Sequence, residues 1–179
     1  NIKGVSPKII KGDIRLKDLA IGFSSNKNIL FQRLNCIIPS GSVTVINGYN
    51  SSGKSSLCNS FLGLVTPLKG NILFDNIDLK NLNIANLRKN ICYLPQEIEL
   101  LNITIKQNIL LNIDKSSSTY NNDGVLIKVI NIVGLNNFIN NQPKGLDTII
   151  DNNGKSIPGG VRKRIGLARA IINNGKIVI

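Results

Sequence analysis

Polar and hydrophobic residues alternate along the first part of the chain, which is typical of β-strands. Residues 14–23 and 28–38 are each predicted to form a strand, with a turn at residues 24–27 between them. Residues 42–47 form a short β-branched run that predicts a buried strand, and apolar residues at helical spacing follow over residues 56–64. Two strands that lead into a strand, a loop and a helix predict an antiparallel sheet packed beside a parallel α/β core.

The rest of the chain is expected to contain more helix than strand. Strands are predicted at residues 71–74, 91–94 and 176–179. A turn at Asp75 and Asn76 follows the first of these strands. Helices are predicted at residues 83–88, 104–111, 123–133 and 161–172. Asp123 is expected to cap the third helix, and Gly175 to end the last. Loops are expected at residues 114–122 and 136–145.

One glycine-rich stretch lies between the strand predicted at residues 42–47 and the helix after it. It matches the pattern G-x-x-x-x-G-K-[ST] with Gly48, Tyr49, Asn50, Ser51, Ser52, Gly53, Lys54 and Ser55, and Ser56 follows directly. In a strand, loop and helix of this kind, consecutive main-chain N–H groups and the positive end of the helix dipole converge on one anion. Lys54 would reach the β- and γ-phosphates of a nucleotide, and the Ser55 hydroxyl would bind Mg²⁺. The four fixed positions match by chance on the order of once in a hundred chains of this length, so a plain Gly/Ser turn is the weaker interpretation.

Length and composition fit one globular domain within a longer polypeptide. The chain has 179 residues, of which 42% are hydrophobic, and this is enough for one well-buried domain. It starts at Asn1 and contains no Met, so we expect it to be a piece of a longer translation product. Residues 1–12 are predicted to be a linker and residues 13–179 the domain itself. No apolar run approaches the ~18 residues that a membrane helix needs, and no signal peptide opens the chain, so any membrane part is expected to lie outside this stretch.

Net charge and cysteine content disfavour some classes of protein. The chain has 22 Lys and Arg residues against 10 Asp and Glu, a net charge of +12, and a basic surface can attract nucleic acid, anionic lipid or ATP. The charges are scattered apart from a cluster at residues 162–164, and aromatic residues at 4% leave few platforms for base stacking. Cys36, Cys58 and Cys92 are far apart and form no C-x-x-C pair, which argues for reduced thiols and against a disulfide framework or a zinc site.

Four features, in chain order, resemble the nucleotide-binding domain of ABC transporters. They are the phosphate loop at residues 48–55, the strand end Tyr93-Leu94-Pro95-Gln96, the run Pro158-Gly159-Gly160 that leads into residues 164–170, and the apolar strand after that helix. The resemblance covers nearly the whole chain from Ile14 to Ile179. It implies an α/β P-loop NTPase core with a mixed sheet, an antiparallel β subdomain and a helical subdomain that carries the signature motif. It also implies that residues 13–179 bind ATP and Mg²⁺ and hydrolyse ATP as part of a transporter.

Shorter matches are similar to the exporter branch of this family, at residues 93–100, residues 104–109 and Gly145-Leu146-Asp147-Thr148. Within that branch they look most like the permease/ATPase of type I secretion systems, which moves unfolded proteins out of Gram-negative bacteria. The resemblance then implies a domain at the cytoplasmic face of the bacterial inner membrane. It also implies two partners: a second nucleotide-binding domain, in a homodimer or a heterodimer, and a transmembrane permease domain on the same polypeptide.

The resemblance also implies roles for residues that match the family's motifs. Phe23 lies where an aromatic residue of the family stacks on adenine. The competing interpretation is that Phe23 is an ordinary apolar residue of the strand, because the sequence pattern would be the same. Gln96 lies where a glutamine contacts Mg²⁺ and the attacking water, so Ser55 and Gln96 are the expected metal ligands, and Lys54 and Gln96 the catalytic residues. A polar cap at a strand end is the competing interpretation of Gln96. Residues 147–154 lie where exporters contact the coupling helices of the permease.

The signature segment departs from the family's L-S-G-G-Q pattern, because it is Ile157-Pro158-Gly159-Gly160-Val161. The family's serine hydroxyl donates to the γ-phosphate of the ATP on the opposing subunit. Pro158 replaces that serine and also lacks a main-chain N–H. The two glycines keep a helix N-terminus and close approach possible, so we expect anion binding there to be weakened and not abolished. The missing charge-assisted hydrogen bond corresponds to roughly 1.5–3 kcal/mol.

Two further departures bear on activity. In the family, the strand that begins at Ile177 ends in an aspartate for Mg²⁺ and a glutamate that polarises water, and this chain stops before both; it also has no His for the γ-phosphate. We therefore predict that the chain alone hydrolyses ATP negligibly. Two other functions stay open. One is a soluble ABC-type ATPase that acts on nucleic acid or ribosomes, supported by the +12 charge. The other is a degenerate regulatory subunit that binds ATP without turnover, suggested by Pro158.

Overall fold

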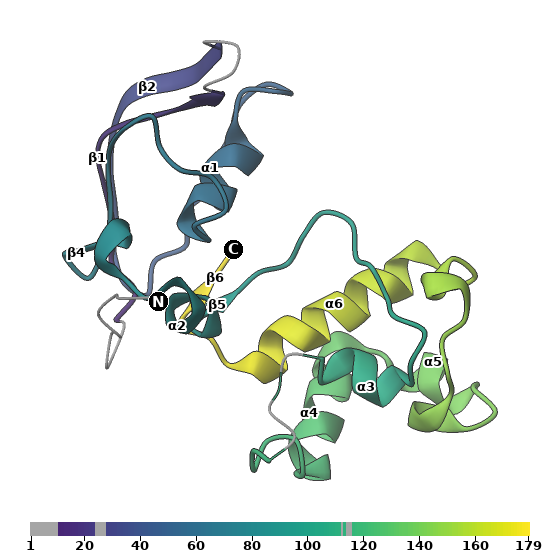
Figure 1. The fold of residues 1–179 in the computed structure, drawn as a ribbon. Coiled ribbons are helices and arrows are strands. Elements are labelled where there is room, and N and C mark those ends of the chain that lie inside the picture. The colour runs from purple at the N-terminus through teal and green to yellow at the C-terminus, as the bar shows by residue number, and fades with distance from the viewer. Residues whose placement is uncertain (1–10, 24–27, 112, 114–115) are drawn as a thin grey trace. The chain divides into compact units, whose positions relative to one another are not determined.

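The computed structural model describes residues 11–23, 28–111, 113 and 116–179. The chain divides into two compact units, residues 1–91 together with Ile179, and residues 92–178. Figure 1 labels most of the helices and strands of both units. Most of the linker predicted at residues 1–12, and the whole turn predicted at residues 24–27, lie outside the described residues.

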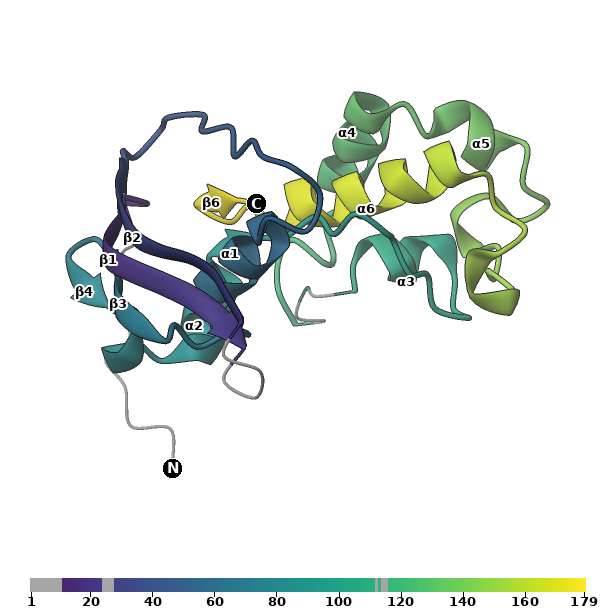
Figure 2. The same cartoon turned by 90° about the horizontal axis from the view of Figure 1, so that it is seen from above.

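The first unit contains a four-stranded antiparallel sheet in the order β2, β1, β3, β4, and Figure 2 labels all four strands. Its strands are β1 (Ile14–Phe23), β2 (Asn28–Ile38), β3 (Lys69–Phe74) and β4 (Ile77–Asp78). Buried side chains from β1 and β3 supply its core: Ile14, Leu16, Leu19, Ile21, Ile72 and Phe74. The alternation in the sequence predicts this sheet correctly, because a strand with one covered face needs apolar side chains on that face only.

The hairpin of β3 and β4 contains the turn predicted at Asp75 and Asn76. Both residues have positive φ, 48° and 70°, which is the conformation of a tight two-residue hairpin turn. The Asp75 carboxylate also accepts hydrogen bonds from the main-chain N–H groups of Lys11, Gly12 and Asp13. This carboxylate therefore fixes the chain that precedes β1 to the turn between β3 and β4.

Two α-helices complete the first unit, α1 (Lys54–Phe61) and α2 (Ile84–Lys89), with the short 3₁₀ helix η1 (Leu79–Asn81) in the chain between them. α1 buries Leu57 and Phe61, whose spacing puts them on one face of the helix. It covers residues 54–61, whereas residues 56–64 were predicted. It ends early because Gly63, with a φ of 65°, follows the C-cap residue Leu62. A glycine in this left-handed conformation is a common way to end a helix.

The buried strand predicted at residues 42–47 is wrong. The structure assigns no strand to this segment, and Val43 and Val45 are 95% and 83% exposed. A buried strand needs neighbouring strands that pair with its main chain and cover its side chains. Neither sheet among the described residues includes this segment, so its β-branched residues lie on the surface of the first unit.

Helices dominate the second unit. They are α3 (Ile105–Ile109), α4 (Asp123–Val133), α5 (Asn136–Asn140) and α6 (Gly159–Asn173), with the 3₁₀ helices η2 (Gly145–Asp147) and η3 (Asn152–Gly154). Figures 1 and 2 both show α6 running beside α3 and α4. One hydrophobic cluster joins these three helices: Ile105, Ile109, Leu126, Val129, Ile130, Ile165, Ala168 and Ile172. The predicted helical subdomain around the signature motif is therefore present. In the described ranges, none of the helices combines the length and the hydropathy of a membrane span.

The loop predicted at residues 136–145 is wrong, because this segment contains α5. Leu135 directly precedes the helix and Ile139 lies within it, and both are buried in the hydrophobic cluster of the second unit. Their spacing of one helical turn lets a single face of α5 cover that cluster. Burial of these apolar side chains outweighs the low helix propensity of the asparagines between them.

The ends of two predicted helices also differ in detail. The side chain of Asn122, and not Asp123, caps α4, since it accepts a hydrogen bond from the N–H of Val125 at 3.2 Å. At its other end, α6 stops at Asn174, whose φ is 48°, one residue before Gly175. Asparagine is one of the few residues that adopt this left-handed conformation without a large penalty, so it replaces the expected glycine as the stop.

A second, two-stranded sheet is formed by β5 (Ile91–Cys92) and β6 (Ile177–Val178). Both strands lie inside the predicted ranges of 91–94 and 176–179 but are shorter. Ile177 is buried, whereas Val178 is 74% exposed. β6, which was expected to be a buried strand, is therefore covered on one face only.

Candidate functional site

The glycine-rich loop at residues 48–53 belongs to the first unit and leads directly into α1. Ser51 and Gly53 have positive φ values of 62° and 93°, so the chain turns tightly at both positions. The N–H of Ser52 donates to the carbonyl oxygen of Tyr49 at 3.3 Å. The loop therefore folds back on itself before the helix begins.

Both glycines of the loop occupy positions where a side chain would force a shift. A Cβ atom on Gly48 would lie 2.9 Å from Oγ of Ser52. Gly53 is buried with a φ of 93°, and a Cβ atom there would lie 3.1 Å from Cβ of Leu30 and 3.3 Å from Cδ1 of Phe31. Glycine is the residue that tolerates both the close approach and the positive φ. The second glycine therefore lets the loop pack tightly against β2.

The ammonium group of Lys54 lies against the main chain of the same loop. Its Nζ atom donates to the carbonyl oxygens of Gly48 at 2.8 Å and Tyr49 at 2.6 Å. Carbonyl dipoles hold the ammonium in place without neutralising it, and neither ion pair found among the described residues involves Lys54. A phosphate at the loop could therefore accept hydrogen bonds from Lys54 without competing against a carboxylate.

The N-terminus of α1 is open to an anion. Gly53 precedes the helix without a side-chain cap, and the first turn contains no acidic residue, so the first N–H groups keep their capacity to donate. Ser55 is exposed at this end of the helix, and Ser56 is half-buried. Free N–H groups, the positive end of the helix dipole and the Lys54 ammonium together fit the charge and the acceptors of a nucleoside triphosphate.

A second open helix N-terminus, that of α6, lies in the other unit. Pro158 occupies the N-cap position without a capping side chain, and Gly159 and Gly160 begin the helix. All three are exposed, and a Cβ atom on Gly160 would meet no atom within 4 Å. The first turn again contains no acidic residue. The close approach expected from the glycines is therefore possible, whereas Pro158 offers a phosphate neither a hydroxyl nor an N–H.

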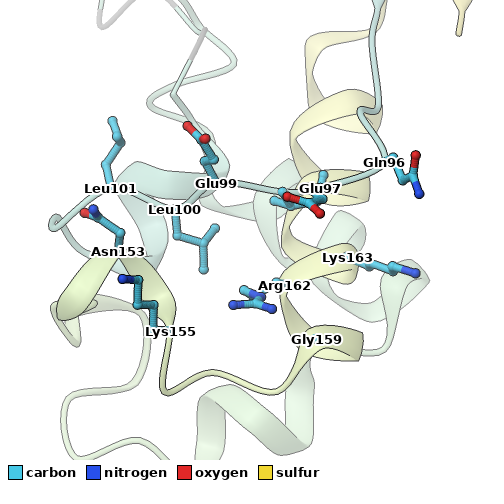
Figure 3. A pocket seen from close by; sticks show the side chains of 11 residues that line it. Gln96, Glu97, Glu99, Leu100, Leu101, Asn153, Lys155, Gly159, Arg162 and Lys163 are labelled. Atoms are coloured by element: carbon cyan, nitrogen blue, oxygen red, sulfur yellow. The ribbon is translucent and has the colours of Figure 1, made fainter. Parts of the chain in front are cut away.

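Beside the start of α6, the second unit has a polar cavity of about 680 Å³ (Figure 3). One wall is the segment at residues 96–101, and the other comes from η3, the turn after it and α6. The first wall carries the carboxylates of Glu97 and Glu99, while the second carries the cationic groups of Arg162 and Lys163 (Figure 3). The cavity is therefore lined by both signs of charge, which suits a polar protein segment better than an apolar ligand.

One protein family matches most of the chain. The profile of the ABC transporter family matches residues 31–179. The chain belongs to the ABC transporter family. The matched range includes the phosphate loop, Gln96 and the whole of α6.

Several characterised and uncharacterised ABC proteins are similar to the chain over nearly its whole length. An uncharacterized ABC transporter ATP-binding protein of Sinorhizobium fredii is 34% identical over 168 residues, which are 94% of this chain and 28% of the relative. The ATP-dependent lipid A-core flippase of Haemophilus influenzae is 28% identical over 94% of this chain and 28% of its own length. Multidrug resistance protein pgp-1 of Caenorhabditis elegans is 30% identical over 95% of this chain and 13% of its own. The chain thus spans less than a third of each of these relatives.

Among solved structures, a bacterial Atm1-family ABC exporter with ATP bound has the same fold. Its TM-score is 0.86 over 97% of this chain and 30% of that chain, at 24% sequence identity. At that identity the likeness concerns the fold alone. It confirms the predicted α/β architecture of an ABC nucleotide-binding domain, with an antiparallel part and a helical part.

The structure of this ABC domain brings together some of the predicted site residues and not others. Residues 48–56 are adjacent on the loop and the start of α1. Phe23 ends β1, and its side chain lies outside the described part of the molecule. Gln96 and Gly159 belong to the second unit, whereas the phosphate loop belongs to the first, so their joint action on one nucleotide stays a prediction.

Two residues of this domain that sequence reasoning missed are Asn108 and Arg169. Asn108 is fully buried on α3, between the core residues Ile105 and Ile109. The Arg169 guanidinium on α6 donates to the main-chain carbonyl of Asn108 at 2.6 Å. A polar residue inside the apolar face of a predicted helix was the available signal, because such a residue needs buried partners.

Proposed function

We propose that this chain is the ATP-binding and ATP-hydrolysing domain of an ABC exporter. The observation that carries the proposal is the Lys54 ammonium fixed beside Gly48, on a loop that leads into the open N-terminus of α1. The N–H groups of the loop and Lys54 would bind the β- and γ-phosphates, and Ser55 and Gln96 would hold Mg²⁺. Mg²⁺ bound there would neutralise charge on the phosphates during transfer.

The remaining steps of the reaction need little covalent chemistry from the protein. Phosphoryl transfer to water depends mostly on positioning and charge neutralisation. Gln96 would orient the attacking water, and Phe23 would position the nucleotide by stacking on adenine. Because the chain has no His, and residues 176–179 contain no carboxylate, we propose that these 179 residues alone bind ATP but turn it over negligibly.

A second nucleotide-binding domain is the first proposed partner. The exposed start of α6 would present Gly159 and Gly160 to the γ-phosphate held by that partner. ATP would then hold the two domains together, and hydrolysis would remove the attraction and let them separate. The partner is either a second copy of this chain or a related chain.

A transmembrane permease domain on the same polypeptide is the second proposed partner. One supporting observation is that the relatives are much longer than this chain. Another is that the mixed-charge cavity is lined by Asn153, which belongs to residues 147–154, the range expected to contact the permease. The domain would then work at the cytoplasmic face of the bacterial inner membrane. We propose protein export by a type I secretion system, supported by the sequence motifs at residues 93–100 and 104–109; the relatives' names mention lipid A-core and drugs instead.

Calorimetric titration of the purified chain with ATP and Mg²⁺ tests the proposal. Lys54→Ala should lower the affinity for ATP at least about tenfold, because a charge-assisted hydrogen bond to phosphate is lost. Lys80→Ala is the matched control, since Lys80 is exposed in the same unit, and it should leave the affinity unchanged. Absence of ATP binding, or equal binding by the Lys54→Ala variant, would contradict the proposal.

A regulatory subunit that binds ATP without turnover is the second candidate. The observation that favours it is Pro158 at the N-cap of α6, where neither a hydroxyl nor an N–H is offered. Nucleotide trapped per dimer of the complete transporter separates the two candidates. One hydrolysed and one retained ATP per dimer would favour the regulatory role, and turnover at both sites would exclude it.

A further inference from the structure

Residues 98–101, which follow Gln96 and Glu97, are each attached to the helical unit. Ile98 packs onto α6 so closely that a Cβ atom on Gly166 would lie 2.5 Å from its Cδ1 atom. Leu100 packs onto Gly154 at the end of η3 in the same way, and the corresponding distance is 2.7 Å. Glycine at both positions therefore lets the segment lie directly on the main chain beneath it.

The residues between and after these contacts are held through their main chain. The carbonyl oxygen of Glu99 accepts a hydrogen bond from Nη1 of Arg169 at 2.8 Å. Leu101 forms two hydrogen bonds with the side chain of Asn108: its N–H donates to Oδ1 and its carbonyl accepts from Nδ2, both at 3.0 Å. Each residue from 98 to 101 thus has its own attachment to α3, η3 or α6.

Asn108 uses both ends of its buried amide in this arrangement. Nδ2 also lies within hydrogen-bond distance of the carbonyl oxygens of Ile103, at 3.3 Å, and Thr104, at 3.1 Å, so its two hydrogens are shared among three acceptors. Oδ1 also accepts from Nη2 of Arg169 at 2.8 Å. An aspartate would lack the donors and a leucine would lack donors and acceptor alike. Either would leave buried main-chain groups without partners, which is costly.

Arg169 joins the segment to α3 and α6 at once. Its guanidinium donates to the carbonyls of Glu99 and Asn108 and to the Asn108 side chain. All these acceptors are uncharged, and neither ion pair among the described residues includes Arg169. Burial without a counter-ion lowers the pKa of the guanidinium. A planar fork reaches several fixed acceptors together, which a lysine ammonium does not reproduce.

We infer that Arg169 and Asn108 are positioning residues that lock the segment after Gln96 to α6, so that Gln96 moves together with the helix start at Gly159. The inference rests on the proposed function for the roles of Gln96 and Gly159. α6 carries Gly159 in its first turn and Arg169 further along the same rigid helix. A phosphate of the partner domain that binds at Gly159 would therefore also set the position of Gln96.

Hydrogen exchange measured by mass spectrometry on the complete transporter tests the lock itself. In Arg169→Lys, amides in residues 97–104 should exchange about tenfold faster, because the hydrogen bonds that hold them are lost. Residues 123–133 on α4 should exchange as before. Arg164→Lys is the matched control, since this exposed arginine of the same helix donates its hydrogen bond outside the segment, to the carbonyl of Gly134 at 2.9 Å. Unchanged exchange in residues 97–104, or equal acceleration in α4, would overturn the inference.

Ile98→Ala provides a second variant that keeps the guanidinium. It removes the packing on Gly166 and should speed exchange in the same residues 97–104. If Arg169→Lys does not fold, Arg169→Gln, which also removes the guanidinium, takes its place. Slow exchange retained in residues 97–104 of that variant would overturn the inference, whatever the exchange in Ile98→Ala.

Steady-state ATP hydrolysis tests whether the lock acts through Gln96. Arg169→Lys should lower kcat about tenfold and change the KM for ATP less than about twofold, because the phosphate loop is untouched. In a Gln96→Ala background the same substitution should have no further effect on kcat. If the two substitutions lower kcat additively, Arg169 acts on stability and not on Gln96. If the complete transporter hydrolyses no ATP, the proposed function fails, while the exchange measurement still decides the lock.

Discussion

The Nζ atom of Lys54 lies 2.8 Å from the carbonyl oxygen of Gly48, so the lysine near the end of the phosphate-loop motif is hydrogen-bonded to the first residue of the motif. A second hydrogen bond from Nζ to Tyr49, at 2.6 Å, strengthens this closure. The same ammonium therefore has two tasks: it holds the loop folded and it supplies charge for a phosphate. Binding of a nucleotide would replace carbonyl acceptors with phosphate oxygens.

We expect Lys54→Met to loosen the loop even when no nucleotide is present. The substitution removes both hydrogen bonds to carbonyls while keeping much of the aliphatic chain. Amides in residues 48–53 should exchange with solvent about tenfold faster in the variant. Lys89→Met, at an exposed position on α2, is the control and should leave the loop unchanged. Equal exchange in both variants would refute the holding role of Lys54.

Gly53→Ala should destabilise the first unit more than Gly41→Ala does. Both glycines have positive φ, 93° and 71°, but a Cβ atom at Gly53 would lie 3.1 Å from Leu30, whereas one at Gly41 would meet nothing within 4 Å. The control therefore measures the conformational penalty of about 1 kcal/mol, and the difference measures the clash with β2. Urea unfolding should give Gly53→Ala an additional loss of about 1–3 kcal/mol. Equal losses would mean that the loop shifts without cost.

The antiparallel sheet could be predicted from the sequence because its pattern is local. Alternating apolar residues at 14–23 and 28–38 define one covered face without reference to any other segment. The segment at residues 42–47 has an equally strong β-branched pattern, yet it is exposed and unpaired among the described residues. Burial of a strand depends on its neighbours, and composition carries no information about them.

The phosphate loop could be predicted because its motif specifies main-chain geometry directly. Gly48 and Gly53 occur where a Cβ atom would collide, so the sequence pattern and the shape of the loop express the same constraint. The partners of Arg169 could not be predicted, since two of its three acceptors are main-chain carbonyls. Every residue has a carbonyl, so such contacts leave no trace in the sequence.

Alkylation should reveal a graded order among the three cysteines. Cys36 is exposed, Cys58 on α1 is half-buried, and Cys92 is buried. Burial raises the pKa of the Cys58 thiol, so less thiolate is present at a given pH and Cys58 should react more slowly than Cys36 with iodoacetamide. Raising the pH should reduce the difference between the reaction rates of Cys36 and Cys58, and unfolding in urea should remove it. Peptide mass spectrometry gives the order, and a Cys58 that reacts first at pH 8 would contradict the assignment.

The ion pair of Lys106 and Asp123 should contribute little to stability and only below alkaline pH. Nζ of Lys106 lies 2.8 Å from Oδ1 of Asp123, and this hydrogen bond raises the pKa of Lys106. A raised lysine pKa in the folded state stabilises the fold at pH values below the ordinary lysine pKa, and the contribution is lost as the pH rises through the raised value. Both groups are accessible to solvent, so Lys106→Gln should lower the free energy of unfolding by no more than about 0.5 kcal/mol.

Chemical denaturation at several pH values measures this contribution. The difference between the native chain and Lys106→Gln should be constant near neutral pH and should shrink in strongly alkaline solution. A difference that grows with pH would have the wrong sign for a charge-assisted contact. Lys128→Gln on the exposed face of α4 is the control and should show no such pH dependence.

Restoring the family's residues at the start of α6 should raise ATP hydrolysis in the complete transporter. Pro158 occupies the N-cap and supplies neither hydroxyl nor N–H, while Gly159 and Gly160 remain exposed beside it. In Pro158→Ser with Val161→Gln, the serine hydroxyl would add a charge-assisted hydrogen bond to the partner's γ-phosphate. Such a bond corresponds to roughly 1.5–3 kcal/mol, so the rate should rise about tenfold or more.

Val161→Gln alone is the matched control for this experiment, because it adds a polar side chain in the same turn but no N-cap hydroxyl. Serine is also a better N-cap than proline, so the thermal stability of both variants must be compared with the rate. A higher melting temperature without a higher rate would mean that the introduced serine only caps α6. A higher rate in the double variant, absent from the control, would show that proline at this position limits the contact between the helix start and ATP on the partner.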